Sequence, residues 1–453
     1  MMTIKFLGGA GSVTGSKYLL SIDDKRILVD CGLYQGVKNL RSKNWQIFPI
    51  DASKIDAILL THAHIDHSGY IPALMKTGFK GPVFTSSGTL DLCSVLLPDS
   101  GYLQEEDARY ANKKHFSKHS PAVPLYTEED ARKSLGLFKP ISMNKTVEIA
   151  SGITATFTPV GHILGASAIR VVAKGRSITF SGDVGRSNDL VMKPPQILNE
   201  TDYLVVESTY GNRLHGKLDV FEYFEEIINK TSKRGGIVLM PSFAVGRTQI
   251  NLHILQILKQ SHRIPNLPIF LNSPMAISAT EIYCKHSKEH KLSYEQCNLI
   301  EQGTKYIRTS EESIELNNSS YPSVIISASG MASGGRVLHH LKSLVTHHQN
   351  SIVFIGYQAP GTRGDAMVNG ANEIKIHGEY YPVKAEIHHN DSLSAHGDYA
   401  EIIDWLERSN LSPQRVFVTH GERSAADAMR LKLKDKFLWN TCVPELNDEF
   451  KLH

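Results

Sequence analysis

The chain has 453 residues, of which 41% are hydrophobic and 21% are charged, so its composition is that of a globular protein and excludes a collagen, a coiled coil or a wholly disordered chain. Lysine and arginine number 49 against 46 acidic residues, and the resulting net charge of +3 neither requires nor excludes a nucleic-acid partner. Five scattered cysteines without a CxxC pair, no signal peptide and no apolar run of about 18 residues predict a cytoplasmic protein that does not contact a membrane.

The first half of the chain is rich in short predicted strands. They fall at residues 3–9, 17–22, 26–30 and 56–61, and the last of them ends in the sequence HAHIDHSG. An apolar helix, the strand PVFTS and a polar helical stretch to about residue 115 follow. Four more strands then occur in close succession between residues 151 and 207. Close succession of this kind predicts antiparallel sheets with helices outside them.

The pattern changes near residue 210, where strands begin to alternate with helices. One of these helices has an apolar face made by Ile250, Ile254, Ile257 and Leu258. Such alternation is typical of a parallel, doubly wound sheet. From about residue 372 the short strands return, with a helix at 398–409. We therefore predict one domain, residues 1–208 and 372–453, interrupted by a second domain at residues 209–371.

Candidate metal ligands follow several of the predicted strands. They are His62, His64, Asp66, His67, His162, Asp183 and His420. Imidazole and carboxylate donors without cysteine are more typical of a catalytic metal site than of a structural one, whereas a polar turn that merely carries histidines is the weaker interpretation. Seven ligands exceed the need of one tetrahedral ion, so two metals are predicted, an arrangement suited to phosphoryl displacement. Asp30 ends a strand and is predicted to hold a ligand imidazole in place.

Glycine-rich loops provide candidate phosphate contacts. Ser329, Gly330, Ser333, Gly334 and Gly335 precede a predicted helix, where free backbone N–H groups can bind an anion and Arg336 adds positive charge. The alternative is an ordinary turn between a strand and a helix. Similar loops carry Ser242, Arg247 and Arg363 at the ends of strands, which is where open parallel sheets bind ligands. Together these loops predict a surface that contacts phosphates of a nucleic acid.

These motifs together resemble a known family. HAHIDHSG, the GH pair at 161–162, SGD at 181–183 and the strand ending at Asp30 are similar to the metallo-β-lactamase superfamily. VESTYG at 206–211, SLSAHGD at 392–398 and VTHGE at 418–422 resemble the additional motifs of its β-CASP nuclease branch, as do the GRTQ, NSPMA and ASGMASGGR segments. The resemblance implies an α/β protein in which an αββα metallo-β-lactamase sandwich carries an inserted doubly wound β-CASP domain.

The resemblance also implies roles for the candidate residues. One zinc ion would take His62, His64 and His162, the other would take Asp66, His67 and His420, and Asp183 would bridge them. His396 would act as the general acid with Glu207 as its orienting carboxylate, and Asp66 would count among the catalytic groups as well as the ligands. Asn272 and Leu393 depart from the family pattern, which usually has Asp and Phe there.

The implied activity is zinc-dependent hydrolysis of RNA, leaving 5′-phosphate and 3′-hydroxyl ends, in RNA processing or decay. A DNA-directed β-CASP nuclease is an alternative, although that branch typically lacks the histidine found here as His420. A small-molecule metallo-hydrolase would not need the large insertion, and a scaffold subunit with a decayed site should lack ligands that this chain retains. The sequence leaves open a homodimer, the identity of the RNA and the choice between endonuclease and exonuclease.

Overall fold

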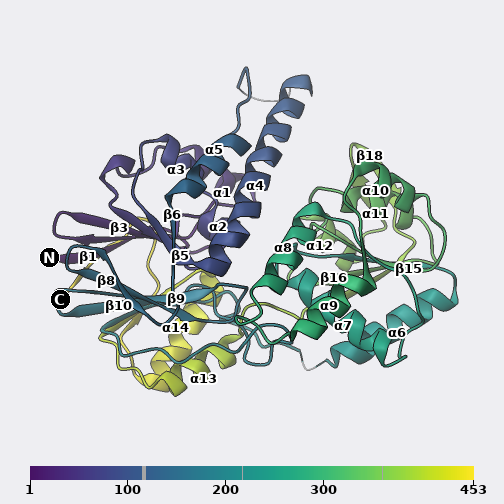
Figure 1. The fold of residues 1–453 in the computed structure, drawn as a ribbon. Coiled ribbons are helices and arrows are strands. Elements are labelled where there is room, and N and C mark those ends of the chain that lie inside the picture. Colours follow the sequence, from purple (N-terminus) through teal and green to yellow (C-terminus); the bar gives the residue numbers. More distant parts are fainter. Residues whose placement is uncertain (115–118, 217, 360) are drawn as a thin grey trace. The chain divides into compact units, whose positions relative to one another are not determined.

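The computed structural model describes residues 1–114, 119–216, 218–359 and 361–453, and these form two compact units (Figure 1). Unit 1 comprises Met1–Asn188, Met192–Leu214 and His396–His453, and unit 2 comprises Asp189–Val191 and His215–Ala395. Unit 2 is thus an insertion in the chain of unit 1. Within the described residues, no helix combines the length and the apolar character needed to span a bilayer.

Unit 1 is built on two seven-stranded sheets. The first contains, in spatial order, β22 (Glu449–Leu452), β1 (Met2–Gly8), β2 (Lys17–Ile22), β3 (Lys25–Val29), β4 (Ala57–Leu59), β5 (Val83–Ser86) and β6 (Phe138–Ile141). The second contains β21 (Thr441–Cys442), β20 (Arg415–Thr419), β11 (Tyr203–Glu207), β10 (Arg176–Phe180), β9 (Ser167–Ala173), β8 (Ile153–Pro159) and β7 (Thr146–Ala150).

One hydrophobic core joins the two sheets. Phe6 and Ile27 from the first sheet belong to the same buried cluster as Phe157, Phe180 and Phe417 from the second. Helices lie on the outer faces (Figure 1), so the unit is the expected αββα sandwich. They are α1 (Lys38–Arg41), α2 (Ile65–Ser68), α3 (Ile71–Lys76), α4 (Ser87–Lys114) and α5 (Glu128–Ser134) with the first sheet, and α13 (Tyr399–Ser409) and α14 (Arg423–Phe437) with the second.

Unit 2 contains a six-stranded sheet in which all paired strands are parallel. Its order is β14 (Thr304–Tyr306), β13 (Ile269–Leu271), β15 (Ser323–Ser327), β12 (Ile237–Pro241), β16 (Ser351–Ile355) and β19 (Glu386–Asn390). The helices between the strands are α6 (Val220–Lys233), α7 (Arg247–Gln260), α8 (Pro274–Lys285), α9 (Tyr294–Gly303), α10 (Ser310–Asn317), α11 (Val337–Leu344) and α12 (Arg363–Val368). Every residue of β12, β15 and β16 is buried, as expected for central strands of a doubly wound sheet.

The strand succession between residues 151 and 207 is only partly antiparallel. β8, β9 and β10 pair antiparallel, but β11 runs parallel to both β10 and β20. Parallel neighbours need a crossover connection, and residues 181–202 provide one between β10 and β11. The prediction of antiparallel sheets was therefore wrong for β11, because the connection that precedes it, which carries Asp183, is long enough for a crossover.

Unit 2 also extends beyond the expected boundary at residue 371. β17 (Glu373–Ile376) and β18 (Glu379–Pro382) form a separate hairpin, and β19 pairs with β16 at the edge of the parallel sheet. These strands lie in unit 2, which continues to Ala395. An edge strand is only partly buried, so the pattern of β19 resembled the short strands of unit 1 more than the central strands of unit 2.

Candidate metal centre and its neighbouring acid

The candidate ligands of unit 1 lie where strands end. His62 and His64 follow β4, His162 follows β8, and Asp183 follows β10. Asp66 and His67 lie in α2, which begins directly after His64. His420 follows β20, and its φ angle of 48° lies in the left-handed region, which is costly for a residue other than glycine. The chain therefore turns sharply at this strand end and directs the His420 ring toward the other donors.

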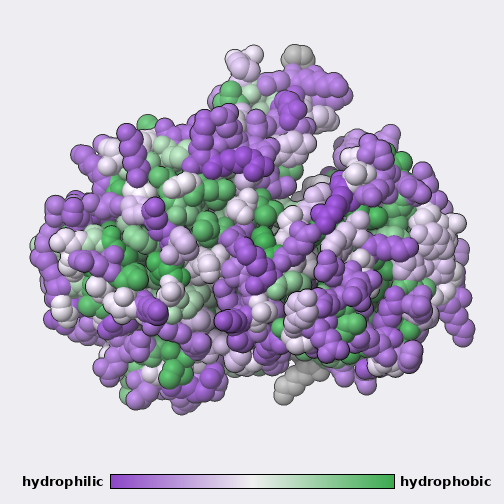
Figure 2. All heavy atoms as spheres, in the orientation of Figure 1, coloured by the Kyte–Doolittle hydropathy of each residue, from purple (hydrophilic) through white to green (hydrophobic). Residues whose placement is uncertain are grey.

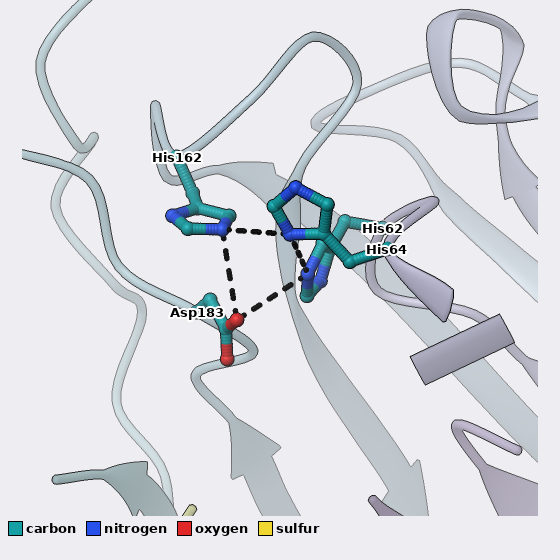
Figure 3. Close-up of side chains that lie close together, drawn as sticks. All are labelled: His62, His64, His162 and Asp183. Atoms are coloured by element: carbon teal, nitrogen blue, oxygen red, sulfur yellow. Dashed lines mark hydrogen bonds and ion pairs between the residues drawn. The ribbon is translucent and has the colours of Figure 1, made fainter. Parts of the chain in front are cut away.

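Four donors converge in a first group (Figure 3). The Nε2 atoms of His62 and His162 lie 3.2 and 3.1 Å from Nδ1 of His64. Oδ2 of Asp183 lies 3.3 Å from Nε2 of His62 and 3.6 Å from Nε2 of His162. Zinc–nitrogen bonds of about 2.0–2.1 Å give a tetrahedron with edges of about 3.4 Å. The spacing of these donors therefore fits one tetrahedral ion.

A second group lies on the other side of Asp183. Nε2 of His420 is 3.2 Å from Nε2 of His67 and 3.4 Å from Oδ2 of Asp66. The second carboxylate oxygen of Asp183, Oδ1, lies 3.3 Å from Nε2 of His67. Each oxygen of Asp183 thus faces one group of donors, so the structure brings together all seven candidate ligands and places Asp183 between the two groups.

Residues behind the donors fix the imidazole rings. Oδ2 of Asp30 lies 2.7 Å from Nδ1 of His67, which leaves Nε2 of that ring available to an ion. Thr61 donates from its backbone N and its hydroxyl to Asp30, and its hydroxyl also lies 3.0 Å from Nδ1 of His62. Thr61 was missed by the sequence analysis, although it directly precedes His62. A hydroxyl residue next to a ligand was the available signal.

Burial and charge set the protonation of these groups. Burial lowers the pKa of His62 to about 3 and that of His64 to about 4, so both rings are neutral and offer lone pairs. Burial also opposes the charged forms of His67 and Asp183, but the Asp183 and Asp30 carboxylates raise the pKa of His67, and the neighbouring histidines hold the pKa of Asp183 well below its usual range. The neutral rings of His62 and His64 beside the ionised Asp183 carboxylate are donors of the kind that zinc and related divalent ions prefer, whereas His67 has to release a proton to bind an ion.

His396 and Glu207 form a pair beside this centre. Nδ1 of His396 lies 3.1 Å from each carboxylate oxygen of Glu207, the last residue of β11. Glu207 is buried and accepts from the backbone N of Val184 at 2.6 Å and from the hydroxyl of Thr209 at 2.6 Å. Nε2 of His396 lies 4.0 Å from Oδ2 of Asp183, and the ring is 19% exposed. Its Nε2 edge thus lies at the rim of the donor cluster, where a substrate can approach.

The candidate phosphate loops lie in unit 2. Ser242 follows β12, Ser329 and Gly330 follow β15, and Arg247 begins α7. Because β12 and β15 are parallel neighbours, these loops lie together at the carboxyl ends of the strands.

Two of the arginines in these loops bind backbone carbonyls. The Arg336 guanidinium donates to the carbonyls of Ile307 and Arg308 at 3.0 and 2.8 Å. Arg363 donates to the carbonyl of Lys375 at 2.6 Å and to that of Ala332 at 3.2 Å. Both side chains therefore brace the loops in this structure.

The departure at Asn272 has a local explanation. Its buried amide donates from Nδ2 to Ser313 and lies 2.7 Å from Nε2 of His340, while its Oδ1 accepts from Arg336 at 2.9 Å. A carboxylate could not donate to either neighbour. Burial lowers the pKa of His340 to about 4, which keeps this ring neutral and able to accept from Asn272. Leu393 is buried, and nothing in the structure explains its departure.

The fold and the seven converging donors define a hydrolase of the metallo-β-lactamase type. Three family models match the chain: the metallo-β-lactamase superfamily at residues 11–212, the Beta-Casp domain at 248–367, and the Zn-dependent metallo-hydrolase RNA specificity domain at 380–444. A solved structure of a protein of unknown function from Enterococcus faecalis covers 100% of both chains with a TM-score of 0.55 at 13% identity, which shows the shared fold.

Characterised relatives cover nearly the whole chain. It is 33% identical to Ribonuclease TTHA0252 of Thermus thermophilus over 93% of both chains. It is 30% identical to Transcription termination factor FttA of Methanocaldococcus jannaschii, over 97% of this chain and 70% of the relative. Identity to Cleavage and polyadenylation specificity factor subunit 3-I of Arabidopsis thaliana is 32%, over 94% of this chain and 60% of the relative. The chain belongs to the β-CASP branch of the metallo-β-lactamase superfamily and is an enzyme of that branch's metal-dependent nuclease class.

Proposed function

We propose that the chain is a zinc-dependent ribonuclease that hydrolyses RNA phosphodiester bonds with two zinc ions, leaving 5′-phosphate and 3′-hydroxyl ends, in RNA processing or decay. The observation that carries the proposal is the division of seven donors, five of them buried, into two groups that share Asp183, with His396 at their rim. The names of the relatives and of the matched RNA specificity domain support RNA as the substrate. A cytoplasmic location and a homodimer stay predictions from the sequence.

The two groups of donors suit two ions. His62, His64 and His162 would hold one, Asp66, His67 and His420 would hold the other, and each oxygen of Asp183 faces one group. When bound there, zinc would polarise a phosphoryl oxygen and lower the pKa of water. Asp30 supports this arrangement by accepting from Nδ1 of His67, which keeps Nε2 directed toward the ion.

His396 would serve the departing oxygen. A water molecule releases one proton to solvent as its oxygen bonds to phosphorus, the bond between phosphorus and the 3′-oxygen breaks, and Nε2 of His396 gives its proton to that oxygen. The carboxylate of Glu207 accepts a hydrogen bond from the N–H group at Nδ1 and so fixes the ring with Nε2 toward the donor cluster. This sequence leaves the phosphate on the 5′ side of the downstream fragment and a hydroxyl at the 3′ end of the upstream one.

The test combines metal analysis with product analysis. Protein purified without chelator should carry close to two zinc ions per chain and should cut an RNA labelled at either end but spare the same sequence as DNA. The replacement His348→Ala, at an exposed histidine of unit 2, serves as a matched control that should change neither property. A protein that binds no zinc after reconstitution, or products ending in cyclic phosphate, would refute the proposal, because a cyclic phosphate shows attack by the 2′-oxygen of the RNA itself.

A further inference from the structure

Two exposed aromatic side chains lie at the end of the unit 2 sheet that is formed by the carboxyl ends of its strands. Phe243 is the second residue after β12, and Tyr357 is the second residue after β16. β12 and β16 are neighbouring parallel strands, so both residues follow carboxyl ends at the same sheet edge. The two side chains are 40% and 39% exposed, whereas every residue of the strands that precede them is buried.

The Phe243 ring packs against the backbone of a glycine, Gly330. A side chain at Gly330 would place its Cβ 2.8 Å from the ring, so the ring packs closely on this glycine. The carbonyl of Phe243 accepts from the hydroxyl of Thr248 at 2.8 Å, which fixes the backbone beneath the ring. On the Tyr357 side, the side chain of Gln358 donates to the carbonyl of Gly330 at 3.3 Å. Gly330 therefore contacts both the Phe243 ring and the side chain of Gln358, the residue after Tyr357, and the Phe243 ring packs on Gly330 while 40% of its side chain is exposed.

The surroundings of these rings are basic and rich in glycine. Arg247 begins α7 four residues after Phe243, and its Nε lies 3.7 Å from the position that a Cβ of Gly356 would take. Arg363 approaches from α12 and binds the carbonyl of Ala332, two residues after Gly330. Glycine backbone with arginines gives an apolar protein partner little surface to bury, but it suits a polyanion that carries flat rings.

We propose that Phe243 and Tyr357 form a stacking platform for unpaired bases of RNA. The inference rests on the proposed ribonuclease function and assigns to these two residues the contacts with bases of its substrate. In a duplex each base is covered by its neighbours, so a protein ring can stack only on a base that has left the helix. Stacking is tolerant of sequence because every base has an aromatic face, and it contributes about 5- to 150-fold in affinity per base.

The test measures binding to a short fluorescent RNA of unstructured sequence, with chelator present so that the RNA stays intact. The same RNA annealed to its complement and the same backbone without bases serve as comparison ligands. We expect Phe243→Ala and Tyr357→Ala each to weaken binding of the single strand by about 5- to 150-fold. Phe243→Trp should retain binding because it keeps an aromatic ring, and neither alanine variant should bind the baseless backbone less well than the unaltered protein.

A matched control is Tyr294→Ala, which removes a 77% exposed aromatic side chain elsewhere in unit 2 and should leave RNA binding unchanged. An equal loss on the baseless backbone would overturn the inference, because the rings would then only shape the loops. Unchanged binding by both alanine variants would also overturn it, because the rings would then make no contact with RNA bases. If the zinc-loaded unaltered protein still cuts RNA in either case, the proposed function stands; if that protein neither binds nor cuts RNA, both proposals fail.

Discussion

The role of His396 as a proton donor can be tested by changing the leaving group. We expect His396→Ala to slow RNA cleavage by about 10²–10⁴-fold, the usual contribution of a general acid, which corresponds to about 3–5 kcal/mol. The upper half of that range is expected here because the ring is positioned in advance. Glu207 accepts from it through both oxygens at 3.1 Å and is itself held by Val184 and Thr209 at 2.6 Å.

The assay compares single-turnover cleavage of two RNAs, one with the normal 3′-oxygen and one with sulfur in its place at the scissile bond. A departing thiolate is stable without a proton, so the defect of His396→Ala should shrink on the sulfur substrate. Glu207→Gln should cause a milder defect of the same kind, because an amide still positions the ring but no longer favours its proton. Zinc content should stay near two in both variants. An equally deep defect on the sulfur substrate would show that protonation of the leaving group is not the role of His396, and loss of zinc would make His396 a ligand.

Three further changes test the centre and its support. Asp183→Ala should abolish binding of both ions, because each oxygen of Asp183 faces one group of donors; zinc analysis showing two retained ions would contradict the bridging position. Asp30→Asn should weaken zinc affinity by about 10–100-fold in competition with a chelator, and an unchanged affinity would show that His67 needs no orienting carboxylate. Gly32→Ala should destabilise unit 1 by about 1–3 kcal/mol or more, since the new Cβ would lie 1.6 Å from the carbonyl oxygen of Asp66. Urea unfolding followed by tryptophan fluorescence measures the loss of stability. Gly136→Ala is the control, because nothing lies close to a Cβ at that position. Equal stability of the two variants would refute the argument.

The sequence predicted the architecture well where one local signal determined the element. The run of β12 is entirely apolar, and β15 has serine only at its two ends. α7 buries Ile250, Ile254 and Leu258 of the predicted apolar face, but Ile257 is only partly buried and most other residues of the helix are buried as well. The direction of β11 could not be read in this way, because its own residues are buried whether its neighbour runs parallel or antiparallel. β19 lies in unit 2 because it pairs with β16, and the composition of the strand does not reveal this pairing.

For the site, too, the sequence indicated the residue types but not their arrangement in space. Metal-donor residue types and their positions after strands were visible in the sequence, but the distances that separate them into two groups depend on pairings such as that of Glu207 with Thr419. Arg336 illustrates a limit of composition. A charge in a glycine-rich loop suggests phosphate binding, yet its guanidinium donates to two backbone carbonyls, and no local pattern records where distant carbonyls will lie.

The order of the donors along the chain governs when the centre can exist during synthesis. Ser208, next to the end of β11, donates to the carbonyl of Thr419 across 211 positions of sequence, and all of unit 2 except Asp189–Val191 is made between the two. A nascent or truncated chain that stops within unit 2 has most of the donors but lacks His396 and His420. The last segment of unit 1 therefore supplies both the final metal ligand and the acid. A chain that lacks this segment cannot form the complete site, so the site is assembled only late in synthesis.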